Sequence, residues 1–168
     1  LPKNKKIILF ISASGTNDYR KGFHILKKML NKLEKIENFH LLIVGSTSKK
    51  DLFDLRIEKT ILNKFFFGSY NNLNLIYSCS DLLVVPSLIE PFGQVALEAS
   101  SCGTPVLAFR NTGLEDIIKH MYTGYLADYL NEDDFIHGFK WIINKFELNQ
   151  KKIREYGINN FSEKIISE

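Results

Sequence analysis

The sequence predicts an α/β fold in which a doubly wound parallel sheet is covered by helices on both faces. Short apolar runs alternate along the chain with longer stretches of helical periodicity, and this alternation indicates successive βαβ units. The runs are continuously apolar, as expected for parallel strands that are buried on both faces. The 168 residues match the size of one domain, so we expect a single domain over residues 1–168.

Each expected strand is a short apolar run that ends at turn-forming residues or at a proline. In chain order, the expected strands are 7–11, 41–44, 65–67, 82–85 and 106–109. Apolar residues recur at helical spacing from Phe23 to Leu33 and predict an amphipathic helix over 21–36. Further helices are expected at 75–79, 93–101 and 131–146, the last with Asn131 as its N-cap.

The composition is that of an ordinary globular domain. Hydrophobic residues make up 45% and charged residues 24%, and the net charge is +3. This charge is too small to predict a nucleic-acid partner by itself, and no apolar run of about 18 residues that could span a bilayer occurs. Cys79 and Cys102 lack metal-ligand spacing, so we expect two buried free thiols in a reducing compartment, the cytoplasm.

In an open parallel sheet, ligands bind beyond the carboxyl ends of the strands. The loops expected at that edge are 12–21, 45–50, 68–71, 86–93 and 109–114. The first loop lacks G-x-G-x-x-G, and G-x-x-x-x-G-K-[ST] occurs nowhere in the chain. A dinucleotide-dependent oxidoreductase and a P-loop nucleotidase therefore lose their main support.

The segment over residues 81–105, DLLVVPSLIEPFGQVALEASSCGTP, carries the most chemical information. A buried strand leads into a loop that contains Glu90, and the helix that follows carries Glu98. The backbone N–H groups expected at the start of that helix are those of Phe92, Gly93 and Gln94. Such groups form a ready anion site, and a glycine among them lets a ligand approach the backbone closely.

This segment resembles the donor-binding motif of retaining GT-B glycosyltransferases of the family 4 type, an E-x7-E pair inside a longer frame. The frame reads here as Pro86-Ser87, Glu90, Phe92-Gly93 and Glu98-Ala99. The similarity continues in Gly103-Thr104-Pro105-Val106, Gly113-Leu114, Asp116-Ile117-Ile118, Gly124-Tyr125-Leu126 and, upstream, Arg20-Lys21-Gly22. The resemblance covers most of the chain and implies a Rossmann-like domain, one half of a GT-B fold, that binds a nucleotide-diphosphate sugar.

The resemblance also implies roles for individual residues. Glu98 would accept hydrogen bonds from both ribose hydroxyls, and Glu90 would meet the transferred sugar close to its anomeric carbon. Lys21 would neutralise the diphosphate. Together with the helix dipole it could replace a divalent metal, so we expect neither a metal ion nor a cofactor. The base, in a UDP- or GDP-linked sugar, would lie near Gly68 and Ser69.

The sequence departs from the family at the end of the first strand. Family members commonly place an arginine there as a second cation for the diphosphate, whereas this chain has Ser12-Ala13-Ser14. Arg20, beside Lys21, is the candidate substitute. Gly113 is either a glycine that allows close approach of the phosphate or sugar, or an ordinary turn residue.

The rest of the enzyme is expected to lie outside this chain. The opening Leu1-Pro2 indicates an excised fragment, and the resemblance implies a missing N-terminal domain that binds a glycan or lipid-linked acceptor in polysaccharide or glycoconjugate biosynthesis. This fragment alone should be inactive in hexosyl transfer. The basic residues Lys145, Lys151, Lys152 and Arg154 leave open a weak contact of the full-length protein with the inner face of the membrane.

Two alternatives remain open. One is a nucleotide-sugar-binding module that kept the fold but lost catalysis, which a replacement of Glu90 or Lys21 would favour; both residues are present. The other is a different GT-B enzyme, such as a nucleotide-sugar epimerase or a phosphorylase, against which the E-x7-E frame argues.

Overall fold

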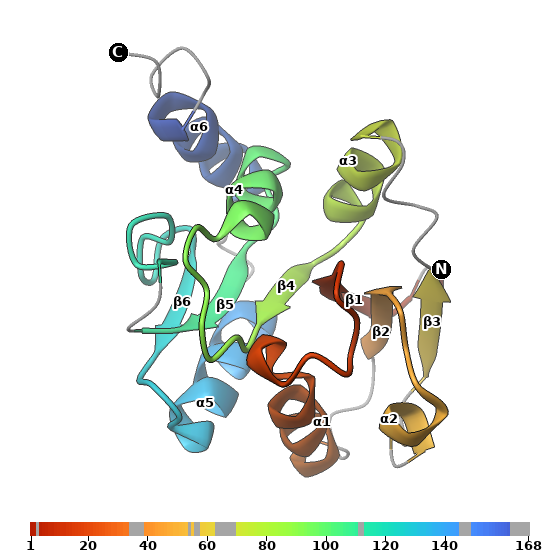
Figure 1. Cartoon of the computed structure of the whole chain (residues 1–168). Coiled ribbons are helices and arrows are strands. Elements are labelled where there is room, and N and C mark those ends of the chain that lie inside the picture. Colours follow the sequence, from red (N-terminus) through yellow and green to blue (C-terminus); the bar gives the residue numbers. More distant parts are fainter. Residues whose placement is uncertain are drawn as a thin grey trace.

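The computed structural model describes residues 1–2, 4–33, 39–53, 55, 58–62, 70–110, 113–144 and 149–161. Within these ranges a six-stranded parallel sheet has the strand order β3-β2-β1-β4-β5-β6 (Figure 1). The strands are β1 (Lys6–Ser12), β2 (Phe39–Gly45), β3 (Lys59–Leu62), β4 (Leu82–Val85), β5 (Val106–Phe109) and β6 (Gly124–Ala127). The order reverses between β1 and β4, and this reversal is the topological switch point of a doubly wound fold.

Helices cover both faces of the sheet. In Figure 1 α1, α2 and α5 lie below the sheet, whereas α3 and α4 lie above it with α6 packed on α4. The helices are η1 (Tyr19–Lys21, a 3-10 turn), α1 (Phe23–Lys32), α2 (Lys49–Phe53), α3 (Tyr70–Ser78), α4 (Gln94–Ser101), α5 (Glu132–Asn144) and α6 (Gln150–Phe161).

Two hydrophobic clusters, one on each face, explain why the strands are continuously apolar. Successive side chains of a strand point to opposite faces, so Ile8 and Phe10 of β1 join the cluster between the sheet and helices α1 and α5. Ile7 and Leu9 join the cluster between the sheet and helices α3 and α4. All four side chains are buried, and the sheet therefore holds the carboxyl ends of β1 and β4 in a rigid setting.

The predicted strands are largely confirmed. Runs 7–11 and 41–44 lie within β1 and β2, and 82–85 and 106–109 coincide with β4 and β5. The run 65–67 lies outside the described residues. The elements β3, β6, α2 and α6 were not predicted. β3 (Lys-Thr-Ile-Leu) and α6 are largely polar, β6 (Gly-Tyr-Leu-Ala) begins with a turn-forming glycine, and α2 has only five residues.

The expected helix over 21–36 differs most from the structure. Lys21 closes the 3-10 turn η1, and α1 begins only at Phe23. Gly22 separates the two elements with a left-handed backbone (φ +69°), a conformation that glycine adopts without the steric cost borne by other residues. Lys21 is therefore held in a turn rather than in the first turn of an α-helix.

Two smaller expectations had different outcomes. Asn131 caps α5 as predicted, because its side-chain oxygen accepts a hydrogen bond from the N–H of Asp134 at 3.1 Å. The expectation of two buried thiols is wrong. Both cysteines are free, but Cys79 is exposed and Cys102 is half-buried, since each lies just after the C-terminal end of a helix, in the turn that precedes the next buried strand.

Candidate functional site

A cavity of about 270 Å³ opens at the switch point of the sheet, between the carboxyl ends of β1 and β4. Its walls come from the end of β1, the turn η1, the loop after β4 and the start of α4. The lining residues are Phe10, Ile11, Ser12, Ala13, Ser14, Lys21, Val84, Val85, Pro86, Ser87, Glu90, Gln94 and Val95. This is the position at which doubly wound sheets bind their ligands.

Gly22 brings the two main loops of the site together. A Cβ atom at Gly22 would lie 1.8 Å from the carbonyl oxygen of Pro86, so only glycine permits this close approach of η1 to the loop after β4. The N–H of Leu88 donates to the carbonyl oxygen of Arg20 at 2.8 Å and ties the same two segments. The contact places Lys21 opposite Glu90.

We expect Gly22→Ala to destabilise the domain and distort the site together. A left-handed alanine costs about 1–2 kcal/mol, and the contact with Pro86 forces a further shift of one loop. Because about 1 kcal/mol shifts the melting temperature of a domain this size by about 2–4 °C, calorimetry should show a decrease of about 4–8 °C. Tyr19→Phe, in the same turn, is the matched control and should melt like the parent. An unchanged melting temperature for Gly22→Ala would contradict the packing argument.

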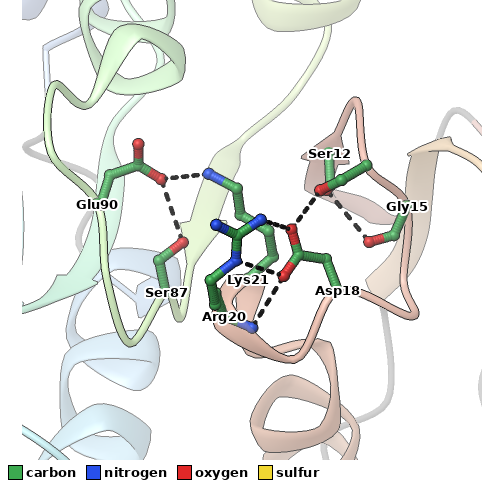
Figure 2. A network of polar contacts seen from close by, with 8 residues as sticks. Ser12, Gly15, Asp18, Arg20, Lys21, Ser87 and Glu90 are labelled. Carbon is green, nitrogen blue, oxygen red and sulfur yellow. Dashed lines mark hydrogen bonds and ion pairs between the residues drawn. The ribbon is translucent and has the colours of Figure 1, made fainter.

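Lys21 and Glu90 form an ion pair at the mouth of the cavity (Figure 2). The Nζ of Lys21 lies 2.7 Å from Oε2 of Glu90, with side chains that are 30% and 10% exposed. Ser87, which is buried, donates from its Oγ to the same carboxylate oxygen at 3.3 Å. The carboxylate is thus oriented from two sides, and one of its oxygens has no partner among the described residues.

Arg20 is turned toward a different partner. Its guanidinium donates to both oxygens of the Asp18 carboxylate, at 3.0 and 2.8 Å, and Figure 2 shows the pair beside Lys21. The Arg20 side chain is 68% exposed, and the Asp18 side chain also caps η1 by accepting from the N–H of Arg20. An acidic residue two positions before Arg20 is the sequence feature that could have indicated this ion pair. The role of Arg20 at a diphosphate stays a prediction.

Glu98 lies one helical turn after Gln94 on α4, and both of its carboxylate oxygens have donors. Tyr77 donates from its hydroxyl to Oε2 at 2.7 Å, and Gln94 donates from Nε2 to Oε1 at 3.2 Å. The contact with Gln94 follows from i, i+4 spacing on one helix. The contact with Tyr77 crosses from α3, and the sequence offered no sign of it.

The start of α4 faces the cavity. Gly93 is the N-cap, with a left-handed backbone (φ +63°), and its carbonyl oxygen accepts from the N–H groups of Ala96 and Leu97. The N–H groups of Gln94 and Val95 have no hydrogen-bond partner in the part of the chain that the structure describes. Such groups, reinforced by the helix dipole, attract anions. Phe92, just before the helix, has an exposed side chain.

Two of the predicted glycines are held by packing. A Cβ atom at Gly93 would approach side chains of Leu114 and Ile117 to 2.5 and 2.7 Å. A Cβ atom at Gly113 would lie 2.3 Å from the carbonyl oxygen of Pro91, and the N–H of Gly113 donates to the carbonyl oxygen of Glu90 at 2.8 Å. Both glycines therefore support the loop that carries Glu90, and a ligand contact at either one stays a prediction.

Some expected site features lie elsewhere or stay open. Gly68 and Ser69 lie outside the described residues, as does Lys145. The other basic residues of the surface cluster, Lys151, Lys152 and Arg154, are exposed on α6. Among the described residues, no three histidine, cysteine or acidic side chains are grouped as metal ligands. None of the described helices is both long and apolar enough to cross a membrane.

The sequence matches the family described as glycosyl transferases group 1 over residues 1–160. It is 35% identical over 161 residues to an uncharacterized glycosyltransferase of Methanocaldococcus jannaschii, covering 94% of this chain and 39% of the relative. An uncharacterized glycosyltransferase of Haemophilus influenzae is 30% identical over 186 residues, covering 100% of this chain and 50% of the relative. The chain thus spans half or less of the length of these curated relatives.

Solved structures share the fold. A glycosyltransferase from Rickettsia africae superposes with a TM-score of 0.81 at 24% identity, covering 98% of this chain and 46% of that one. A sucrose-phosphate synthase from Thermosynechococcus elongatus gives a TM-score of 0.73 at 26% identity, with 95% and 40% covered. An Anabaena protein in complex with UDP and glucose gives 0.78 at 18% identity, with 98% and 46% covered. These likenesses confirm the predicted Rossmann-like half of a GT-B fold.

Proposed function

The chain belongs to the glycosyl transferases group 1 family, and we propose that it binds the nucleotide-diphosphate sugar in a retaining transfer to a glycan or lipid-linked acceptor. The observation that carries this proposal is the meeting of Lys21 and Glu90, 69 positions apart, at the switch point of the sheet. At this position the lysine can bind the diphosphate of a nucleotide sugar, and the carboxylate can contact its sugar. We propose a uridine or guanosine diphosphate sugar as the ligand, and the Anabaena neighbour, in complex with UDP and glucose, supports the nucleoside diphosphate class.

The diphosphate would lie between Lys21 and the start of α4. Lys21 contributes a positive charge to the lining of the cavity, and Gln94 and Val95, whose N–H groups have no partner among the described residues, line the same cavity. Negative charge accumulates on the leaving nucleoside diphosphate as the sugar departs, and these groups would stabilise that charge. Because a lysine, a helix dipole and backbone donors supply this positive potential, we propose that no metal ion is needed.

The transferred sugar would lie against Glu90. The bond between its anomeric carbon and the distal phosphate oxygen breaks, a bond to the acceptor oxygen forms, and the proton of the acceptor hydroxyl passes to the departing phosphate oxygen. Positive charge builds up at the anomeric carbon during this exchange, and a carboxylate held nearby lowers its energy. Ser87 and Lys21 orient the Glu90 carboxylate by hydrogen bonds, and a carboxylate that is already oriented needs little reorganisation during the reaction.

The ribose would be held by Glu98. A carboxylate offers about four lone-pair directions, and two of those on Glu98 are taken by Tyr77 and Gln94. The two that remain match the two adjacent hydroxyls of a ribose. Charge-assisted hydrogen bonds of this kind discriminate strongly against a ligand that lacks the donor.

We expect the chain to bind a nucleoside diphosphate in EDTA and to lose that affinity when Glu98 is truncated. Hydrogen bonds to a charged group contribute about 1.5–3 kcal/mol each, so Glu98→Ala should raise the dissociation constant at least about tenfold. A thermal-shift panel of UDP, GDP, ADP and TDP would select the nucleotide, and calorimetry would then measure its affinity. Glu155→Ala, which removes an exposed carboxylate on α6, should bind like the parent.

Two results would contradict this assignment. Equal affinity of the parent and Glu98→Ala would remove Glu98 from the nucleotide site. Binding that appears only after Mg²⁺ is restored would show that Lys21 and α4 do not replace a metal ion.

A further inference from the structure

Tyr77 is a buried residue that links α3 to Glu98 on α4. It lies in the last turn of α3, and its side chain is only 1% exposed. Its hydroxyl donates to Oε2 of Glu98 at 2.7 Å, while its backbone carbonyl oxygen accepts from the buried Oγ1 of Thr104 at 2.7 Å. Tyr77 is thus fixed at both ends, by the core around its ring and by the loop that follows α4.

The hydroxyl of Tyr77 is a permanent donor. Burial first, and the adjacent carboxylate of Glu98 second, raise the pKa of Tyr77 far above its usual value. Ionisation of the phenol would put a second negative charge against Glu98 in a water-poor setting. The proton therefore stays on the tyrosine, and Glu98 always receives this hydrogen bond.

The direction of this hydrogen bond determines what Glu98 can offer to a ligand. With Tyr77 on Oε2 and Gln94 on Oε1, one lone-pair direction stays available on each oxygen. A glutamate without these donors can rotate among several rotamers, and binding then has to immobilise it. A preset carboxylate presents its two free acceptors side by side, as two neighbouring hydroxyls require.

We propose that Tyr77 is a positioning residue for Glu98, which it orients for bidentate binding of the two ribose hydroxyls of the nucleotide. This inference rests on the proposed function, in which Glu98 binds the ribose. Tyr77 itself does not touch the ligand, because it is only 1% exposed and its hydroxyl is turned onto Glu98. Its effect therefore passes through Glu98 alone.

The test uses Tyr77→Phe, which keeps the ring and removes only the hydroxyl. The matched control is Tyr125→Phe on β6, since Tyr125 is also buried and its hydroxyl donates to Asp134 at 2.8 Å, but within the cluster on the other face of the sheet. Calorimetry would compare the tightest-binding of UDP, GDP and ADP with the 2′,3′-dideoxy form of the same nucleotide. Each variant would also be measured in the Glu98→Ala background.

We expect Tyr77→Phe to weaken binding of the ribonucleotide about fivefold, since loss of one such hydrogen bond corresponds to roughly a two- to tenfold change. Binding of the dideoxy nucleotide should change less than about twofold, and Tyr77→Phe should have no further effect on Glu98→Ala. Tyr125→Phe should leave both nucleotides unaffected.

The contrary outcomes separate the inference from the proposed function. Equal weakening of both nucleotides, or a loss that persists in Glu98→Ala, would mean that Tyr77 supports the fold in general and would overturn the positioning role. An unchanged affinity in Tyr77→Phe, with Glu98→Ala clearly impaired, would also overturn it while leaving the proposed function intact. If Glu98→Ala binds the ribonucleotide as tightly as the parent does, the ribose role proposed for Glu98 and the positioning role of Tyr77 both fail.

Discussion

Replacing Glu90 with alanine is expected to lower the turnover number for sugar transfer by about 100-fold or more, the range seen when one preorganised electrostatic group is removed from a transition state. We propose to measure it in a protein in which this chain is joined to an acceptor-binding domain. The affinity for the free nucleoside diphosphate should stay nearly unchanged, because Glu90 would face the sugar. The loss should therefore appear in the turnover number and not in nucleotide binding.

The ion pair between Lys21 and Glu90 leads to a more specific expectation for the nucleotide affinity of Glu90→Ala. Lys21 lies 2.7 Å from Glu90, and the alanine variant frees this cation for the phosphates. Nucleotide affinity should then be retained or slightly increased. Ser87→Ala, which removes only the 3.3 Å hydrogen bond to Glu90, serves as the graded control and should lower turnover by much less.

A parallel loss of nucleotide binding in Glu90→Ala would contradict this division of roles. It would indicate that the substitution disturbs the loop itself, which is held by hydrogen bonds from Leu88 to Arg20 and from Gly113 to Glu90. Both of these bonds use backbone atoms, so they should survive truncation of the Glu90 side chain. Full turnover in the alanine variant would remove Glu90 from the chemistry altogether.

The strands that surround the site could be predicted because strands that are buried on both faces consist of apolar residues. β1, β4 and β5 lie inside the sheet with helices over both faces, so residues 7–11 of β1 and all residues of β4 and β5 are apolar, and each run is easily seen. β3 and β6 form the edges of the sheet. The sequence Lys-Thr-Ile-Leu of β3 begins with two polar residues, and Gly-Tyr-Leu-Ala of β6 begins with glycine, so neither strand stands out from the neighbouring loops as a continuous apolar run.

The candidate site could be predicted in part. The rule for parallel sheets places the loops after β1 and β4 at one edge, and the resemblance singled out Lys21 and Glu90 within those loops. Their direct contact depends on Gly22 packing against Pro86, a close approach that no periodicity reveals. The pairing of Arg20 with Asp18, and of Tyr77 with Glu98, depends on side-chain directions that the sequence leaves open.

The isolated 168-residue chain is expected to bind the donor but to transfer no sugar to an acceptor. The chain spans 39% and 50% of two glycosyltransferase relatives, and the described residues supply groups for the nucleotide and sugar but form a single sheet. An acceptor hydroxyl must be held close to the anomeric carbon, and this positioning supplies much of the rate of a two-substrate reaction. We propose that the acceptor is held by a second domain across a cleft. Without that domain, transfer should fall by at least about 1,000-fold, a modest part of the effective molarities that positioning can reach.

The test incubates the purified chain with the nucleotide sugar selected by the binding panel and with a membrane extract from its source. A longer protein, in which this chain is joined to the proposed acceptor-binding domain, is the positive control. Calorimetry on the same preparation of the chain must show nucleotide binding, so that a lack of transfer cannot be attributed to misfolding. Slow hydrolysis of the donor by water fits the expectation, because the groups that stabilise the leaving nucleotide belong to this chain. Transfer at the rate of the longer protein would show that the acceptor is bound by the residues described here, and the proposed division between two domains would be wrong.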